Sequence, residues 1–149
     1  MTVAASFIRR ATPDDVEFGI GLVRELYPNR DITKMRGWLT WVLNNPDYCT
    51  LIGINSVGCA SVYWKYGTDM RARLQFLGAN TKPGYVFEPL RIVRMLMDWS
   101  KSKGAKGEFR LDADTGVNFA PFAKRLGGTH KTAEYWDIPY PADGELNGR

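Results

Sequence analysis

The stretch that decides the fold runs from residue 69 to residue 113 and reads DMRARLQFLGANTKPGYVFEPLRIVRMLMDWSKSKGAKGEFRLDA. Residues 69–79 alternate between apolar and polar side chains, which predicts a β-strand. After a loop, apolar residues recur at helical spacing over 88–103, and Gly104 ends this helix. Residues 107–113 alternate again. This strand–helix–strand order predicts a parallel crossover unit, which should be right-handed.

A short strand and two helices are expected before this unit. Residues 6–11 alternate and predict the strand. Thr12 can cap the first helix, Pro13 suits its first turn, and the two aspartates that follow complement the positive end of the helix dipole. This helix should end before Pro28, and a second helix is expected over 31–44.

Between these helices and the crossover unit the sequence predicts a β-hairpin. Residues 48–54 and 57–66 are rich in β-branched and aromatic side chains, and Asn55-Ser56 lies between them. With the turn centred on these two residues, Cys49 and Cys59 are several positions out of register and cannot form a disulfide. We therefore expect two buried free thiols in a reducing compartment.

The C-terminal part predicts a short helix over 118–126, which Gly127-Gly128 stops, and a final strand over 129–138. Residues 139–149 are polar and rich in proline and glycine, so we expect a flexible tail. The resulting order is β-α-α-β-β-β-α-β-α-β. It describes one α/β domain over 1–138, with a mixed (α+β) sheet and helices on both faces.

The composition suits one globular domain. Of the 149 residues, 44% are hydrophobic, and 20 basic residues face 16 acidic ones, for a net charge of +4. The basic residues are dispersed, which argues against a nucleic-acid-binding protein. No apolar run is long enough to span a membrane, and the N-terminus lacks the layout of a secretory signal. We expect a soluble cytoplasmic protein without a metal site, since the chain has one histidine and no CxxC motif.

Three segments resemble the GCN5-related N-acetyltransferase (GNAT) superfamily. They are the opening IRRATPDD, the long helix that ends in DWSKSKGAK and leads at once into a strand, and FAKRLGGTH, which looks like the family's F-Y-x-K-L-G-F segment. Together with the element order, the resemblance covers the chain to about residue 138. It implies the GNAT fold and acetyl-CoA as cofactor.

The resemblance also implies where acetyl-CoA would lie. Its pantetheine arm would pair with the strand over 75–79, and its pyrophosphate would rest on amides at the start of the long helix, where unpaired N–H groups and the dipole bind anions. The cofactor-binding positions carried over from the family are Leu77, Gly78, Ala79, Lys82, Gly84, Tyr85 and Asn118.

The pyrophosphate loop departs from the family's Arg/Gln-x-x-Gly-x-Gly/Ala pattern. Phe87 and Pro89 occupy the two glycine positions, and Glu88 brings a negative charge to the place where the pyrophosphate should rest. As a helix start the same residues are ordinary, because proline and an acidic residue are favoured in a first turn. The sequence thus leaves two readings open, an aberrant phosphate loop and a plain helix start.

The catalytic positions are equally open. The family's tyrosine position in the last helix holds Ala123, and the strand over 71–79 has no carboxylate. The candidates that we retain for proton transfer are Glu108 and Tyr135, whereas Asp112 and Asp114 share a strand face with Arg110 and fit a solvated or salt-bridged edge.

Two functions remain. The first is an acyl-CoA-dependent N-acyltransferase that acetylates a small-molecule or peptide amine. The second is a catalytically inactive GNAT-like binding or structural protein whose groove is filled by side chains such as Phe87. A phage-encoded protein or virion component with a protein partner or a second copy of itself would be an example. Whether the chain is an enzyme is thus undecided by the sequence.

Overall fold

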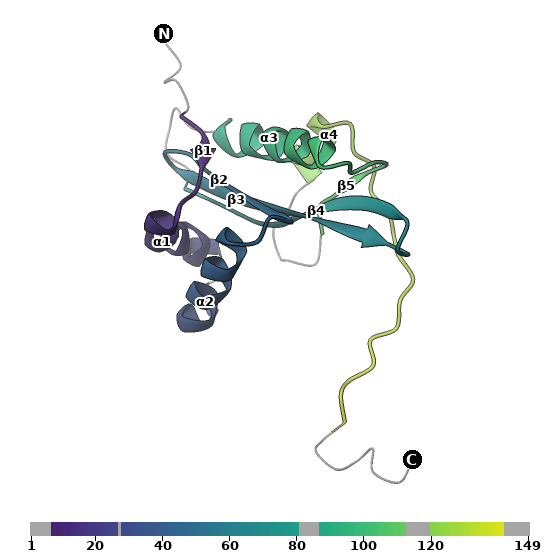
Figure 1. Cartoon of the computed structure of the whole chain (residues 1–149), viewed down its shortest axis with the longest axis horizontal. Helices are drawn as coiled ribbons and strands as arrows, with labels where there is room; N and C mark the ends of the chain where they lie inside the picture. The colour runs from purple at the N-terminus through teal and green to yellow at the C-terminus, as the bar shows by residue number, and fades with distance from the viewer. Residues whose placement is uncertain (1–6, 27, 81–86, 113–119, 142–149) are drawn as a thin grey trace.

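A computed structural model describes residues 7–26, 28–80, 87–112 and 120–141. In it, five strands form one mixed sheet in the order β1-β2-β3-β4-β5. Helices α1 and α2 cover one face of the sheet and α3 covers the other, with α4 beside α3 (Figure 1). None of the described helices is long and apolar enough to span a membrane.

The elements follow the predicted order up to the last helix. They are β1 (Arg9–Arg10), the 3-10 helix η1 (Pro13–Asp15), α1 (Val16–Leu26), α2 (Ile32–Leu43), β2 (Tyr48–Ile52), β3 (Ser56–Lys65), β4 (Asp69–Ala79), α3 (Glu88–Ser102), β5 (Phe109–Arg110) and α4 (Ala120–Arg125). The helix and strand types predicted for these segments are confirmed. The short strands and α4 span fewer residues than expected.

Side-chain caps explain where the first helices begin. The Asp15 carboxylate accepts hydrogen bonds from the Thr12 backbone at 2.8 Å and from the Arg9 guanidinium at 2.7 Å, which fixes the entry into η1 and α1. The Asp31 carboxylate accepts from Thr33 N at 2.9 Å and from Lys34 N at 3.2 Å at the start of α2. Both carboxylates satisfy backbone donors that a helix start would otherwise leave unpaired.

The hairpin register differs from the predicted one by two residues. Cys49 pairs with Ala60 and Cys59 pairs with Thr50, so the turn centres on residues 54–55 instead of 55–56. The two cysteines point to opposite faces of the sheet, because Cys49 packs on the side of α3 and Cys59 on the side of α1 and α2. Both are buried and free, as predicted.

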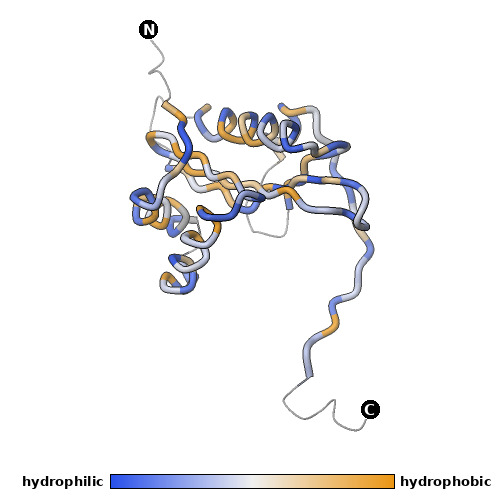
Figure 2. Tube along the Cα trace, viewed as in Figure 1, coloured by the Kyte–Doolittle hydropathy of each residue, from blue (hydrophilic) through white to orange (hydrophobic). Residues whose placement is uncertain are grey.

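The core consists of two clusters, one on each face of the sheet. On the α1–α2 face, helix residues such as Ile20, Leu39 and Val42 pack against Val57 and Phe76. On the α3 face, helix residues pack against strand residues; this cluster includes Ile92, Val93, Leu96, Leu51, Ala60 and Leu74. Hydrophobic residues dominate the central strands and alternate with hydrophilic ones along α3 (Figure 2).

Helix α3 is the crossover between the parallel strands β4 and β5. The ladder between these strands consists of the pairs Ala72↔Phe109 and Arg73↔Arg110. Gly107 turns the chain into β5 with φ +84°, and a Cβ there would collide with the Arg71 guanidinium. The parallel crossover unit predicted from the sequence is confirmed, although β5 is much shorter than the expected strand over 107–113.

The predicted final strand over 129–138 is wrong. Residues 129–141 are extended but belong to no sheet, and every one of them is exposed. Figure 1 shows this segment leading away from the body of the molecule. The alternating sequence is present, but a strand also needs a neighbour that satisfies its backbone groups, and no described strand provides one. The division of the chain at residue 138 stays a prediction.

Candidate functional site

The free edge of β4 is the centre of the candidate site. The β4–β5 ladder ends at the pair Arg73 and Arg110, whereas β4 continues to Ala79. Along this continuation, Leu77 and Gly78 pair with β3, and no described strand pairs with the opposite edge. The unpaired N–H and C=O groups of such an edge can bond an extended ligand.

A β-bulge marks the point where β4 and β5 part. The β3–β4 register shifts between Cys59 and Ala60, which leaves Gln75 of β4 without a directly opposed residue on β3. The Gln75 amide instead donates a hydrogen bond to Ser61 Oγ at 2.6 Å. Bulges of this kind re-aim side chains and backbone groups, and they are common beside active sites.

Glu88 at the start of α3 is buried and engaged. Its carboxylate accepts hydrogen bonds from Asn55 N at 2.8 Å and from Ser56 Oγ at 2.5 Å, in the turn between β2 and β3. Only 2% of the residue is exposed. The sequence placed this negative charge where a pyrophosphate would rest, but the structure directs the carboxylate into the β2–β3 turn. Its position therefore counts less against anion binding than the sequence indicated.

Arg125 of α4, which the sequence analysis did not select, contacts the residue at the start of α3. The Arg125 guanidinium of α4 lies over the ring of Phe87, 5.5 Å from its centroid. Phe87 is half exposed and belongs to neither core cluster, so its ring does not fill the interior. The contact places a cation on the side chain at the N-cap of α3, and the cation and the positive end of the helix dipole both favour an anion.

Aromatic side chains line one end of the open α1–α2 face. Trp38 is edge-on to Phe76 and Tyr48, with ring centroids 5.6 and 6.4 Å apart, and Trp41 is edge-on to Tyr48 at 5.3 Å. More than a third of Trp38 and half of Trp41 are exposed. The rings fix one another and leave an apolar wall open to solvent.

A row of paired residues crosses the same face. Tyr48 pairs with Ser61, Ser61 with Arg73, and Arg73 with Arg110. Directly paired residues share a face, and Tyr48 packs against the α1–α2 cluster, so the row faces that side. The Arg73 guanidinium lies over the Tyr63 ring at 5.2 Å. Neither Arg73 nor Arg110 forms an ion pair with a carboxylate of the described residues.

Asp112 follows β5 at the point of divergence. Phe109 and Leu111 pack against the cluster on the α3 face, so the alternation of an extended chain turns Arg110 and Asp112 toward the α1–α2 face. Counted on from the last ladder pair, Asp112 is level with Gln75 across the gap between the strands. It is half-buried and has an interaction partner.

The comparison with solved structures identifies the fold. The aminoglycoside N-acetyltransferase AAC(6')-Iy in complex with CoA superimposes with a TM-score of 0.74 over 90% of this chain and 94% of its own, at 13% identity. The chain has the GNAT fold. AAC(6')-Ih from Acinetobacter baumannii gives a TM-score of 0.73 at 15% identity, over 92% of this chain and 100% of its own. A Trypanosoma brucei acetyltransferase gives a TM-score of 0.64 at 16% identity, over 89% of this chain and 99% of its own. No protein-family model and no curated protein sequence matches the chain.

Within the GNAT fold, the structure places only some of the predicted cofactor-binding residues. Leu77, Gly78 and Ala79 lie at the end of β4, along its free edge. The other predicted positions, which are Lys82, Gly84, Tyr85 and Asn118, lie outside the described residues. Contact of any of these with acetyl-CoA stays a prediction.

The two predicted catalytic residues, Glu108 and Tyr135, lie in different parts of the fold. Glu108 is exposed and directly precedes β5. Tyr135 is 71% exposed on the segment that leads away from the body of the molecule. Ala123, at the family's tyrosine position, is half-buried on α4. Among the described residues, therefore, Asp112 is the carboxylate nearest in register to the bulge, a position that its sequence context did not single out.

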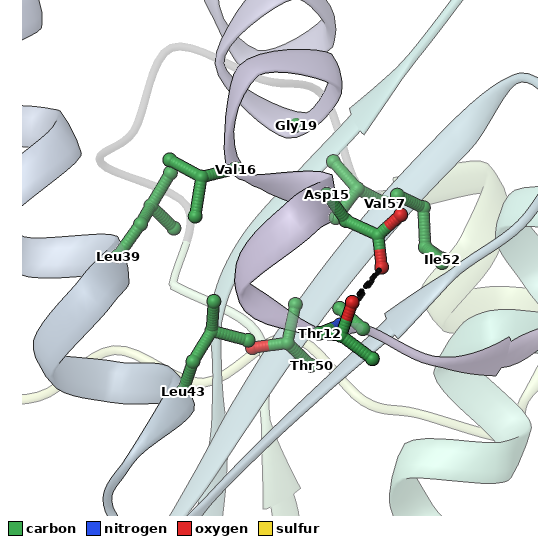
Figure 3. A pocket seen from close by; sticks show the side chains of 10 residues that line it. Thr12, Asp15, Val16, Gly19, Leu39, Leu43, Thr50, Ile52 and Val57 are labelled. Atoms are coloured by element: carbon green, nitrogen blue, oxygen red, sulfur yellow. Dashed lines mark hydrogen bonds between the residues drawn. The ribbon is translucent and has the colours of Figure 1, made fainter.

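A small apolar cavity lies elsewhere, between α1, α2 and the sheet. Figure 3 shows its lining, which includes Asp15, Val16, Leu39, Ile52 and Val57. Its volume is about 10 Å³, enough for one water molecule. This cavity is a packing gap beside the cap of α1 and is too small for a substrate.

Two ionisable groups away from the free edge of β4 have pKa values that their structural surroundings shift. The Arg9 guanidinium, which donates to the Asp15 carboxylate, lowers the pKa of Asp15 to about 2. Burial raises the pKa of the Cys59 thiol to about 12, so this thiol is not a nucleophile. No group of three or more His, Cys, Asp or Glu side chains in the described part of the chain is placed to hold a metal ion.

Proposed function

We propose that the protein is an N-acetyltransferase that uses acetyl-CoA. The observation that carries the proposal is the gap between β4 and β5: their ladder ends at Arg73 and Arg110, whereas β4 continues to Ala79 with one edge that no described strand pairs. The amide groups of a pantetheine arm match such an edge as another strand would. Acetyl-CoA supplies the acetyl group as a thioester, and the chain's own residues bind and orient the two substrates.

The binding of the pyrophosphate is assigned to α3 and α4 in this proposal. Phe87 and Pro89 remove the close backbone approach of a glycine loop, but the positive end of the α3 dipole still favours an anion. Arg125 adds a full positive charge near this end of the helix, 5.5 Å from the Phe87 ring. A charge-assisted contact from this guanidinium compensates for part of the lost amide cradle.

Asp112 is the proposed general base. The acceptor's amine nitrogen attacks the thioester carbonyl, the C–N bond forms, the C–S bond breaks, and the sulfur leaves as the thiolate of CoA. The amine must lose a proton for this reaction, and the Asp112 carboxylate is level with the bulge at Gln75, where the strands part. Backbone N–H groups near Leu77 are the donors that would polarise the carbonyl oxygen.

The acceptor is proposed to be an amine that also carries an anionic group and a flat apolar group. Arg73 and Arg110 present two guanidinium ions on the face from which the amine approaches. Trp38, Trp41 and Tyr48 form the apolar wall beside them. A carboxylate on the acceptor would pair with the arginines while its amine lies toward Asp112. A polycation would meet like charge at the same place.

Titration with acetyl-CoA tests the proposal. We expect the melting temperature to rise by several degrees at millimolar ligand, because a ligand at about 1,000 times its Kd stabilises by roughly 4 kcal/mol. Arg125→Ala should weaken the binding of CoA about tenfold or more and leave the binding of pantetheine, which lacks the pyrophosphate, unchanged. Lys124→Ala, on the same short helix, is the matched control.

The alternative function gives a different result in the same titration. A GNAT-like structural protein would show no rise in melting temperature with acetyl-CoA and no release of CoA thiol with any amine. An equal effect of Arg125→Ala on CoA and pantetheine would reject the role proposed for this arginine while leaving the acetyltransferase function intact.

A further inference from the structure

The carboxylate of Glu88, at the start of α3, lies buried against the turn between β2 and β3. It accepts hydrogen bonds from the backbone N–H of Asn55 at 2.8 Å and from Ser56 Oγ at 2.5 Å, and all three residues are buried. The turn approaches so closely that a Cβ at Gly53 would displace the carboxylate. Burial of a carboxyl group costs free energy unless donors reach it, and the turn supplies two.

The same turn holds the end of β4. Asn80 directly follows β4 and donates its backbone N–H to Asn55 O at 3.0 Å and its side-chain amide to Asn55 Oδ1 at 3.1 Å. Ser56 is the ladder partner of Ala79, the last residue of β4. The two residues that bond the Glu88 carboxylate are thus the two that hold the end of β4. The start of α3 is joined to the end of β4 through the turn.

Chain connectivity does not fix the separation of these two ends. Residues 81–86 join them in sequence, and six residues can span up to about 20 Å. Ile92 and Leu96 pack α3 on the sheet, but they lie about one and two turns farther along the helix. They fix the helix as a whole, whereas the contacts of Glu88 fix its first turn relative to the end of β4.

We propose that Glu88 is a positioning residue for acetyl-CoA. The inference rests on the proposed function, in which the end of β4 binds the pantetheine arm and the start of α3, with Arg125, binds the pyrophosphate. One ligand gains from both contacts only when the two places are held at the separation of its own groups. Glu88 holds them there through its bonds to the turn. It is 2% exposed, so it acts without contacting the ligand.

A positioning role predicts a loss that appears only with the complete ligand. Glu88→Ala should weaken the binding of CoA about tenfold or more, because the two places no longer match one molecule. Pantetheine and 3′-phospho-ADP, the two halves of CoA, should each bind as they bind to the wild type, because each uses one place only. Arg125→Ala should instead weaken 3′-phospho-ADP together with CoA. Calorimetry measures the Kd of CoA, and ligand-detected NMR measures the Kd of each half.

Two further variants separate the contact from the residue. Glu88→Gln keeps an oxygen that accepts from the turn and should restore most of the affinity for CoA. Gly53→Ala should reproduce the loss with Glu88 in place, because its Cβ displaces the carboxylate. Asp31→Ala is the matched control: this carboxylate also accepts from two donors at a helix start, but at α2, and its loss should leave the Kd of CoA unchanged. Circular dichroism checks that each variant is folded.

Hydrogen exchange of the ligand-free chain tests the same contacts without CoA. The Asn80 amide donates to Asn55 O, so Glu88→Ala should speed its exchange by loosening the turn, and Glu88→Gln should not. An unchanged exchange rate in Glu88→Ala would overturn the proposal, because the end of β4 would then be held without Glu88.

Three results of the binding experiments would also overturn it. CoA that binds Glu88→Ala as tightly as the wild type would show that Glu88 does not position the site. Tighter binding would show that its charge repels the pyrophosphate. An equal loss for CoA and for both halves would show general damage. A wild-type chain that binds no CoA would reject the proposed function, and this inference with it, whereas the other results leave the binding of acetyl-CoA established.

Discussion

At the scale of single residues, Asp112 has the most specific proposed role. It follows the last β4–β5 pair and is turned to the same face as Arg110, level with Gln75 at the bulge. We expect Asp112→Asn to lower kcat by about 10²–10⁴-fold, the usual contribution of a general base, and to leave the Kd of acetyl-CoA unchanged. Steady-state kinetics and a thermal titration of the same variant measure the two quantities.

Glu108→Gln is the matched control for Asp112. This carboxylate also neighbours β5 but precedes the ladder, so its removal should leave kcat within a few fold. If instead Glu108→Gln abolished turnover and Asp112→Asn did not, the base would be the residue that the sequence proposed and our assignment would be wrong.

Asp15 makes the stability depend on pH. The hydrogen bond from Arg9 lowers the pKa of this carboxyl from 3.8 to about 2, so the folded state binds the proton less readily than the unfolded chain. Its stabilising effect is therefore complete at neutral pH and is lost as the pH falls from about 4 toward 2. The free energy of unfolding of Asp15→Asn should lie below that of the wild type at neutral pH and converge with it in acid.

Urea denaturation between neutral pH and pH 2 measures this convergence. Glu17→Gln is the control, because the Glu17–Arg36 pair is exposed on both sides and solvent screens it. The free energy of unfolding of Glu17→Gln should follow that of the wild type closely at every pH. A constant gap between Asp15→Asn and the wild type at all pH values would mean that the substitution acts through the lost cap of α1 and not through the carboxyl pKa.

At the scale of elements, Gly58 determines how closely α3 approaches the sheet. A Cβ at this position of β3 would lie 2.5 Å from Ile92 Cγ2 and 3.3 Å from Leu77 Cδ1. Because Ile92 is fully buried and β-branched, its side chain cannot turn away, and α3 must move. We expect Gly58→Ala to lower the free energy of unfolding by about 1–3 kcal/mol, as for other overpacked cores, in urea denaturation.

Gly21→Ala separates this steric effect from the effect of removing a glycine. A Cβ at Gly21 in α1 meets no atom within 4 Å. Alanine is favoured in a helix interior, so this variant should gain about 0.5–1 kcal/mol. If Gly58→Ala were also neutral or stabilising, the close contact of α3 with β3 would not limit the packing of the core.

The elements show why local patterns predict some parts of the fold and not others. The strand over 69–79 and the helix from residue 88 were predicted almost to the residue, because long periodic segments also have a place in the core. The segment over 129–138 has equally regular alternation but no partner in its own sheet, and pairing is a tertiary property. The hairpin register was two residues off because Asn55-Ser56 is a weak turn signal.

The candidate site was predictable to the same limited degree. The resemblance placed Leu77, Gly78 and Ala79 at the end of β4, where no described strand pairs with the edge opposite β3. Arg125 was not found, because its approach to Phe87 depends on how α4 packs beside α3, which no spacing in the sequence encodes. The sequence indicated the strand face of Asp112 correctly. That Asp112 lies beside the point where β4 and β5 part follows only from the pairing of these two strands.

At the scale of the whole molecule, the positive charge of this protein bears on which amine it accepts. Its net charge is +4, and Arg73 and Arg110 face the side from which an acceptor would approach. Aminoglycosides, on which several of the structurally similar enzymes act, are polycations. Similarity of fold at 13–15% identity does not carry substrate preference with it.

Tyrosine and tyramine form a matched pair of acceptors for this question, because they share the ring and the amine and differ in the carboxylate. We expect kcat/KM to be about 10–100-fold higher for tyrosine, the equivalent of one or two charge-assisted hydrogen bonds. Arg73→Ala should remove most of that preference by lowering kcat/KM for tyrosine alone, and Arg94→Ala, on the exposed side of α3, should leave it intact. Equal rates for the two amines, or faster acetylation of an aminoglycoside, would contradict the anionic acceptor, since the guanidinium ions of the open face would then contribute nothing to recognition.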